Sequence, residues 1–230
     1  MPSIEKLLHF LSSAFISAAG VAVLAYGMST YWAESTLRCS PTNTDFFNGT
    51  AKLKITLFNG TEEKISCPRF DKLGESVEVF NRLKTHGEAP VILHCLVVAL
   101  LAVALLGSAG SILITLYNSF SNPYETYMGP VGLYACSGLS ACVATLALIL
   151  YVLNVYPLQM IQALVLAKEK DVKLQNEETN LHVGFFLLIP YICANLIAIL
   201  VVFVYVHTAH TRRKEQEKPT EDAPQDIMMF

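Results

Sequence analysis

The stretch that decides the fold is VGLYACSGLSACVATLALILYVLNVY, residues 131–156. It lies within a run of 42 residues, between Glu125 and Lys168, that contains no Asp, Glu, Lys or Arg, although 15% of the whole chain is charged. A helix needs about 20 apolar residues to cross the hydrocarbon core of a bilayer. Residues 131–156 are therefore predicted to form a transmembrane helix.

Three further charge-free runs, of 27, 36 and 33 residues, have the same character. Their apolar centres predict spans over residues 7–31, 91–116 and 183–206. Because an isolated span must satisfy its own backbone hydrogen bonds in lipid, all four spans are predicted to be helical. The predicted fold class is an all-α membrane protein built on a four-transmembrane-helix bundle, and this composition excludes a soluble globular enzyme.

The segments between the spans complete the predicted organisation. Residues 117–130 form a short connector that contains Pro123 and the pair Gly129-Pro130, so the second and third spans are predicted to be an antiparallel helical hairpin. The first apolar run is too long for a cleaved signal peptide, and we expect it to remain as a span. The remaining segments are the N-terminal residues 1–6, the first loop 32–90, the second loop 157–182 and the C-terminal tail 207–230.

Charge alone gives a mixed answer about orientation. If both termini are cytoplasmic, the inner side carries five Lys and Arg residues, whereas the two outer loops carry eight and three. The glycosylation sequons are more informative, because an acceptor asparagine must face the lumen. Both sequons, at Asn48 and Asn59, lie in the first loop. The first loop is therefore predicted to be extracellular, with the connector and both termini in the cytoplasm.

The cysteines support the same orientation. Four of the six lie within the predicted spans, and only Cys39 and Cys67 lie outside them, both in the first loop. A disulfide between these two is predicted, which implies an oxidising environment around the loop. Closing the 29 residues from Cys39 to Cys67 would stabilise the fold by about 3.6 kcal/mol in the chain-entropy model.

The first loop also contains a pattern typical of a small sheet. Apolar and polar side chains alternate over residues 52–58, which predicts a half-buried strand. Asn59-Gly60 follows, and because both residues tolerate positive φ we predict a type I′ turn that closes a β-hairpin. Leu73, Val77, Phe80 and Leu83 then recur at helical spacing, which predicts a short amphipathic helix before the second span.

Few polar side chains interrupt the spans. None of the four contains an Asp, Glu, Lys or Arg, whereas coupled transporters usually carry such a group in the membrane. The main exceptions are His94 in the second span and Asn195 in the fourth, and each is predicted to make one interhelical hydrogen bond. Neither has a second ligand at metal spacing, so no metal site, cofactor or catalytic residue is predicted.

The tail ends in Asp226-Ile-Met-Met-Phe230. A PDZ domain binds such an end by strand addition, with the terminal carboxylate in a backbone nest and alternate side chains in pockets. Met228 and Phe230 are therefore predicted to form a ligand for a PDZ scaffold protein.

Several segments of the chain resemble the corresponding segments of the clarins, a family of tetraspan membrane glycoproteins related to the claudins. The resemblance rests mainly on the connector SNPYETYMGPVGLY, residues 121–134, and on the tail from Arg213 onward. Claudin-type proteins carry a Trp and a Gly-Leu-Trp motif in the first loop. Trp32 and the pair Leu57-Phe58 stand at those places, so the resemblance implies that these three residues anchor the loop. It further implies a four-helix bundle with a small extracellular sheet, and no enzymatic activity.

The predicted function is that of a non-catalytic plasma-membrane glycoprotein that organises protein complexes, with neighbours bound by the first loop and a scaffold by the tail. Two alternatives remain open: an auxiliary subunit or regulator of an ion channel, and a claudin-like adhesion or junction protein. The expected partners are the lipid bilayer and other membrane proteins. A net charge of −3 gives no basic field for nucleic acid, and no site for a small-molecule substrate is evident.

Overall fold

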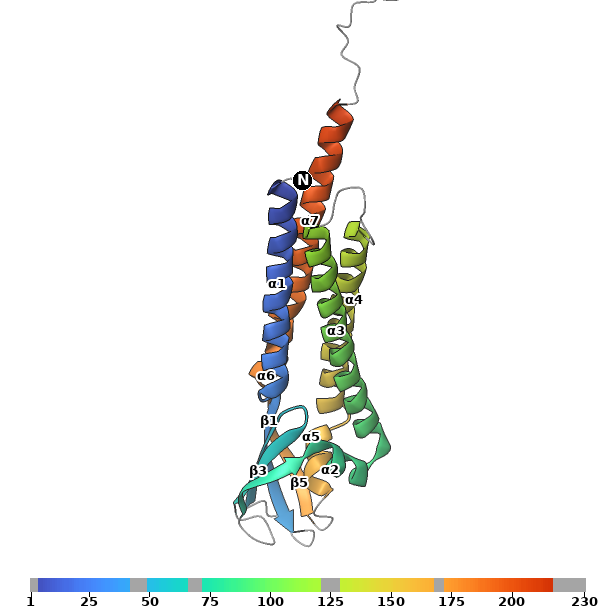
Figure 1. Cartoon of the computed structure of the whole chain (residues 1–230). Coiled ribbons are helices and arrows are strands. Elements are labelled where there is room, and N and C mark those ends of the chain that lie inside the picture. Colours follow the sequence, from blue (N-terminus) through green and yellow to red (C-terminus); the bar gives the residue numbers. More distant parts are fainter. Residues whose placement is uncertain (1–3, 42–48, 66–71, 121–128, 168–171, 217–230) are drawn as a thin grey trace, which may run out of the picture.

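A bundle of four long helices carries a five-stranded sheet at one end (Figure 1). The computed structural model describes residues 4–41, 49–65, 72–120, 129–167 and 172–216. The first residues of the first helix and the last residues of the last helix lie at the opposite end from the sheet, as Figure 1 shows.

The long helices are α1 (Ile4–Ser29), α3 (Glu88–Phe120), α4 (Gly129–Val155) and α7 (Leu188–Gln216). Three short helices are α2 (Val79–His86), α5 (Met160–Leu166) and α6 (Val183–Phe186), the last of which leads directly into α7. Within the described residues, four helical segments are long and apolar enough to cross a membrane. The predicted four-helix membrane fold is confirmed.

The ends of the long helices differ from the ends of the predicted apolar spans. Helix α3 has 33 residues, which corresponds to a length of about 50 Å, whereas the prediction for this span was residues 91–116. A helix can continue past the hydrocarbon core into the aqueous region, where its polar end residues are hydrated. Hydropathy therefore marks the lipid-facing centre of a helix and not its ends.

Small residues allow the helices to approach closely. Helices α1, α3, α4 and α7 form a ring in which each packs mainly against two neighbours. A Cβ on Gly107 of α3 would meet Ser140 Oγ on α4, so the two helices come very close together at this glycine. Ser111 and Ser137 share a hydrogen bond of 2.6 Å across the same pair of helices. Such contacts supply the van der Waals packing that holds helices together in lipid.

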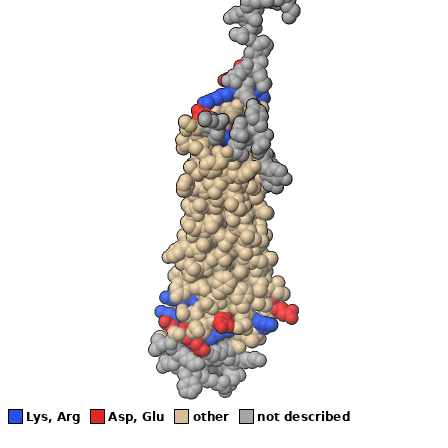
Figure 2. Space-filling model, viewed as in Figure 1, with Lys and Arg blue, Asp and Glu red and all other residues tan. Residues whose placement is uncertain are grey.

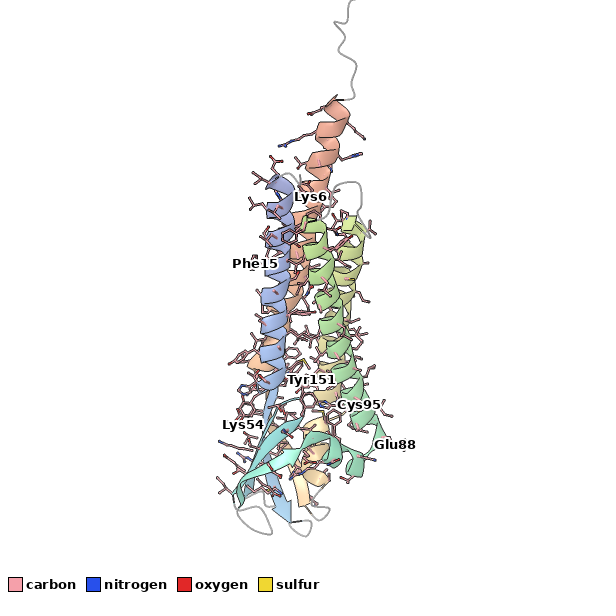
Figure 3. The ribbon with its side chains drawn as sticks, in the orientation of Figure 1. Lys6, Phe15, Lys54, Glu88, Cys95 and Tyr151 are labelled. Atoms are coloured by element: carbon pink, nitrogen blue, oxygen red, sulfur yellow. The ribbon has the colours of Figure 1, made fainter. Side chains whose placement is uncertain are left out.

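The surface divides into three zones. In Figure 2 the Lys, Arg, Asp and Glu side chains lie near the two ends of the molecule, and the long middle carries none on the visible face. Figure 3 shows Phe15 pointing away from the bundle, and this side chain is 69% exposed. Exposed apolar side chains around a charge-free middle are what lipid contact requires.

The sheet contains strands from both loops. Its strands are β1 (Ala33–Pro41), β2 (Gly49–Ile55), β3 (Asn59–Ile65), β4 (Lys72–Glu78) and β5 (Val172–Leu181), in the order β4-β3-β2-β1-β5. All neighbours pair antiparallel. The second loop was predicted only as a loop, yet it contributes both α5 and the edge strand β5.

One face of the sheet belongs to the main hydrophobic core. Leu37, Leu53 and Ile55 are fully buried and join the cluster that continues into α2, α5 and the ends of the long helices. Full burial of each such side chain contributes about 1.5–3 kcal/mol. The alternation predicted for residues 52–58 is therefore real, and its apolar side faces the bundle.

The turn of the hairpin differs from the prediction. Thr56 N donates to Asn59 O at 2.7 Å, and Ile55 pairs with Gly60, so Leu57 and Phe58 form the turn and Asn59-Gly60 begins β3. Among the described residues φ is positive only at Gly74, Gly129 and Gln159, so the type I′ assignment is wrong. Tertiary contacts of Leu57 outweigh the local preference of Asn-Gly.

Gly60 has a different role from the one predicted. A Cβ at this position would lie 2.7 Å from the carbonyl oxygen of Lys54 on β2. The glycine is needed because two backbones approach closely there.

The predicted amphipathic helix is only partly present. Residues 72–78, which include Leu73 and Val77, form strand β4, and the helix begins only at Val79. Val77 is buried at the edge of the sheet, where pairing of Gly60 with Val77 places it. The spacing of four residues between Leu73 and Val77 is compatible with a helix or with a strand, and pairing with β3 decides the outcome for this segment.

Candidate functional site

The face of the sheet that points away from α2 and α5 is not covered by any described helix. Its side chains alternate with the buried ones along β1, β2 and β3. At its centre, Thr36 of β1 lies opposite Lys52 of β2 and Glu178 of β5. The open face, as we name it, comprises Glu34, Thr36, Arg38, Lys52, Lys54, Thr61, Glu63, Gln175, Glu178 and Asn180.

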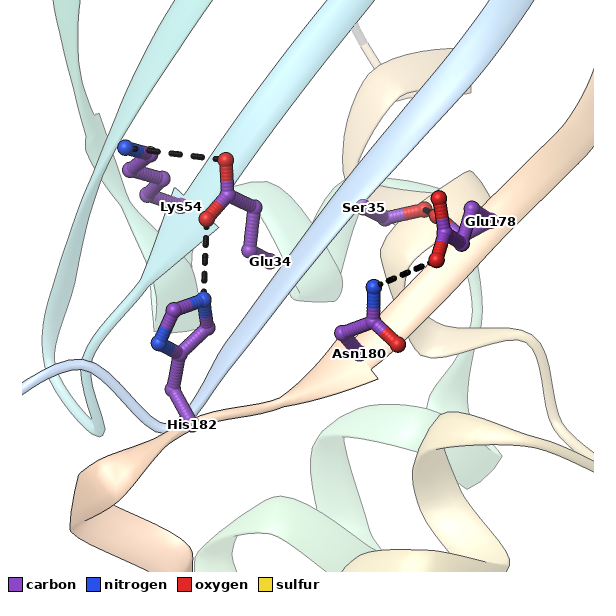
Figure 4. A network of polar contacts seen from close by, with 6 residues as sticks. All are labelled: Glu34, Ser35, Lys54, Glu178, Asn180 and His182. Carbon is purple, nitrogen blue, oxygen red and sulfur yellow. Dashed lines mark hydrogen bonds and ion pairs between the residues drawn. The ribbon is translucent and has the colours of Figure 1, made fainter.

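Glu34 organises the part of the open face nearest the bundle (Figure 4). Its carboxylate lies 2.8 Å from His182 Nε2 and 3.5 Å from Lys54 Nζ. His182 stands where β5 leads into α6, so this contact ties the second loop to the first. Exposed pairs of this kind contribute at most about 1 kcal/mol, and they leave most of the charge available to a partner.

Both edges of the sheet are irregular. The β1–β5 register shifts between Thr36 and Leu37, and the β3–β4 register shifts between Glu62 and Lys64. Gly74 of the edge strand β4 has φ of 71°. Bulges and charges at an edge disfavour the addition of another strand. The open face is therefore a better candidate for partner binding than the edges.

Charged residues also lie on the covered face. Glu62 of β3 is only 1% exposed, and its Oε2 accepts a hydrogen bond of 2.7 Å from Arg82 Nη1 on α2. Lys64 Nζ lies 3.3 Å from Glu62 Oε1, an ion pair without hydrogen-bond geometry. The contact between Arg82 and Glu62 holds α2 against the sheet.

Replacing Arg82 by methionine is expected to lower the free energy of unfolding by about 3 kcal/mol, because a buried carboxylate then loses its main partner. Thermal unfolding of the purified protein measures the change. Lys84→Met is the matched control, since Lys84 is exposed on the same helix. Equal unfolding temperatures for the two variants would show that the contact between Glu62 and Arg82 does not stabilise the fold.

Trp32, predicted as a loop anchor, is fully buried at the junction between the sheet and the bundle. Its Nε1 donates to Gly27 O at 2.8 Å, and its ring packs edge-on against Tyr151 of α4 with centroids 4.9 Å apart. Its backbone N–H donates to Ile55 O, and its carbonyl accepts from the N–H of His182, both at 2.8 Å. One residue thus joins α1, both loops and α4.

Leu57 and Phe58, the other predicted anchors, differ in how deeply their side chains are buried. Leu57 is fully buried, and its carbonyl lies 2.7 Å from His94 Nε2. Phe58 is 46% exposed and makes a ring contact with Phe80 of α2. Phe58 is therefore a partly exposed neighbour of the anchor, because the turn points it outward while Leu57 points into the core.

The two polar residues predicted in the spans, His94 and Asn195, form hydrogen bonds with different kinds of partner. His94 bonds the hairpin turn, so its hydrogen bond joins a helix to the sheet and is not interhelical as predicted. Asn195 of α7 accepts a hydrogen bond of 3.2 Å from Ser108 Oγ on α3, and this bond does join two helices. Tyr191 completes that cluster by donating to Ala104 O at 2.9 Å. The sequence pattern gave no signal for Tyr191, since a tyrosine near a span end is usually an interfacial residue.

The covalent features fall partly outside the described residues. Cys39 is buried and disulfide-bonded, while Cys67 lies outside the described residues, so the pairing of the two stays a prediction. Asn59 is exposed at the start of β3, and Asn48 lies outside the described residues, as do Met228 and Phe230. In the ranges that the structure describes, no group of three or more His, Cys, Asp or Glu could hold a metal ion.

Comparison with known proteins agrees with this architecture. No family model matches the chain. The chain is 31% identical to Clarin-3 of Mus musculus over 237 aligned residues and 30% identical to Clarin-3 of Homo sapiens over 233, and each alignment covers the whole of both chains. Clarin-3 of Rattus norvegicus is 31% identical over 231 residues, again over the full length of both. The chain therefore belongs to the clarin family.

Proposed function

We propose that this clarin is a non-catalytic plasma-membrane glycoprotein that organises membrane protein complexes through the open face of its sheet. The observation that carries the proposal is a broad, charged sheet surface that no described element covers, held rigidly on a membrane bundle by Trp32 and His94. Both signs of charge occur on the face, which suits a protein surface better than a uniformly charged polymer.

The open face is tested by changing its centre. Thr36→Glu together with Lys52→Glu places two new negative charges there, and it is expected to abolish proximity labelling of the neighbours that the wild type labels in its native tissue. Lys84→Glu is the control, because it adds the same kind of change on α2, away from the open face. The surface amount of each variant is measured alongside. Unchanged labelling at equal surface amount would contradict the proposal.

The same experiment separates the alternatives. If the neighbours are channel subunits whose labelling survives changes on the open face, lateral packing of the helices explains them, as for an auxiliary subunit. If cells aggregate in a manner that depends on residues 39–67, an adhesion role replaces the organising role. The irregular edges of the sheet favour binding on the face over strand pairing between cells.

The proposed orientation places the sheet outside the cell and both termini in the cytoplasm. Asn48→Gln together with Asn59→Gln is expected to shift the protein on a denaturing gel to the position of the enzymatically de-glycosylated wild type, because both sequons of the first loop then lose their acceptors. Asn59 is exposed, as a glycosylated residue must be. A band that does not move in the double variant would mean that neither sequon carries a glycan.

A second contact is proposed for the cytoplasmic side. Phe230→Ala is expected to abolish binding of the tail to a PDZ domain, since the last side chain fills the main pocket of such a domain. Binding of the full-length protein to an array of PDZ domains measures it. Gln225→Ala serves as the control, because that residue precedes the segment that would add as a strand. Retained binding by the Phe230 variant would rule out this mode of recognition.

A further inference from the structure

Three buried polar atoms near the sheet end of the bundle lack a hydrogen-bond partner within the described part of the chain. They are His94 Nδ1 on α3, and Tyr151 OH and Asn154 Oδ1 on α4. Each of the three residues is 0% exposed. A buried polar group without a partner is costly, and most such groups in folded proteins are bonded to protein or to ordered water.

The packing of α3 against α4 brings these residues to one region. Asn154 Nδ2 donates to Pro90 O at 3.2 Å, and Ser140 Oγ donates to Ala104 O at 3.1 Å. Together these bonds set the antiparallel register, which places Tyr151 at the level of His94. Asn154 then lies one helical turn closer to the sheet, beside Pro90. Figure 3 places Tyr151 in the interior just above the sheet.

The hydrogen bonds that His94 and Asn154 already form determine whether their remaining polar atoms donate or accept. His94 Nε2 faces the carbonyl of Leu57, so it carries the hydrogen, and Nδ1 of the neutral ring is an acceptor. Asn154 Nδ2 faces the carbonyl of Pro90, so the remaining Oδ1 is also an acceptor. Tyr151 OH can donate. The site thus offers two acceptors and one donor.

We propose that His94, Tyr151 and Asn154 bind a buried water molecule that joins α3 to α4 beneath the hairpin turn. Water has two hydrogens for the two acceptors and a lone pair for the Tyr151 hydroxyl, and buried waters typically make about three such bonds. A lipid hydroxyl has only one hydrogen, so it cannot satisfy both acceptors. A water bound there would lie where the sheet is attached to the bundle, because His94 contacts the Leu57 carbonyl and the Tyr151 ring packs against Trp32.

Radiolytic hydroxyl labelling of the wild-type protein tests the site directly, because water bound beside a side chain generates the radical that modifies it. Tyr191 is the matched control: it is also 0% exposed, but its hydroxyl is bonded to Ser108 Oγ at 2.7 Å and to Ala104 O. Tyr151 is expected to be labelled and Tyr191 to stay unlabelled. In Asn154→Leu, which removes one acceptor, the labelling of Tyr151 is expected to fall.

The sign of a stability change gives a second test. Tyr151→Phe is expected to lower the unfolding midpoint by about 2–4 °C if the hydroxyl donates to water, whereas loss of a dry, unpartnered hydroxyl would leave the midpoint equal or raise it. Tyr26→Phe controls for the substitution, since Tyr26 is 63% exposed. Either an unlabelled Tyr151 or a midpoint that does not fall overturns the proposal.

Discussion

Gly184→Ala is expected to unfold the junction between the sheet and the bundle. A Cβ at this position would lie 2.5 Å from Trp32 Cδ1 and 2.8 Å from the carbonyl oxygen of Gly27. The indole is fully buried and the carbonyl is backbone, so neither can move without breaking the Trp32–Gly27 hydrogen bond. The expected loss is about 3 kcal/mol, the upper part of the usual range for overpacking.

The measurement is the amount of monodisperse full-length protein that survives heating, followed by size-exclusion chromatography. A loss of 3 kcal/mol corresponds to a fall of roughly 6–12 °C in the midpoint. Gly138→Ala on α4 is the matched control, because no atom lies within 4 Å of a Cβ built there. Its midpoint is expected to stay the same or rise, since alanine favours a helix. Equal behaviour of the two variants would mean that the junction tolerates an extra methyl group.

Trp32→Ala is expected to have an effect at least as large. Truncation of a buried tryptophan typically costs about 3–5 kcal/mol, and here it also removes the donor to Gly27 O and the contacts with Tyr151 and Phe185. We expect a midpoint more than roughly 10 °C below that of the wild type and retention of the variant inside the cell. The same heating assay and a surface-biotinylation assay measure these two effects.

Phe58→Ala is the control for Trp32→Ala. Both residues are aromatic and were predicted as anchors, but Phe58 is 46% exposed. Its truncation is expected to cost well under half as much, because the transfer free energy scales with the apolar area buried. A Phe58 variant as unstable as the Trp32 variant would contradict the roles assigned to the two side chains.

The helices could be predicted because lipid imposes a simple rule on the sequence. Each span must lack charges over about 20 residues, so the interval between Glu125 and Lys168 is sufficient to place α4. The alternation over residues 52–58 likewise reflects a single physical cause, the burial of one face of β2. Both patterns are local, and local patterns are readable from one sequence.

The features that could not be predicted depend on contacts between distant residues. His94 is bonded to a carbonyl 37 positions earlier in the chain, and no pattern near either residue encodes that distance. The turn at Leu57-Phe58 forms because Leu57 is buried and Val79 N donates to Phe58 O at 3.0 Å, although Asn59-Gly60 has the stronger turn preference. Strand β5 has little apolar alternation of its own, and its pairing with β1 defines it.

In the candidate site, too, some features could be predicted from the sequence and others depend on the fold. Trp32 could be identified from the resemblance, but the reason for its importance, a shared contact with Gly27 and Gly184, exists only in the fold. The open face could not be outlined in advance because it combines strands from both loops. At its centre Thr36 lies between Lys52 on β2 and Glu178 on β5, and Glu178 is 142 positions from Thr36 in the sequence.

In the orientation that we propose, the sheet stands outside the cell and both ends of the chain lie in the cytoplasm. Epitope accessibility on living cells measures this most directly, with one tag inserted between Thr44 and Asp45, outside both β1 and β2, and another placed after Phe230. We predict that antibody reaches the first tag on intact cells and the second only after permeabilisation. If the tag after Phe230 is reached on intact cells and the loop tag is not, the orientation and the proposed function are both wrong.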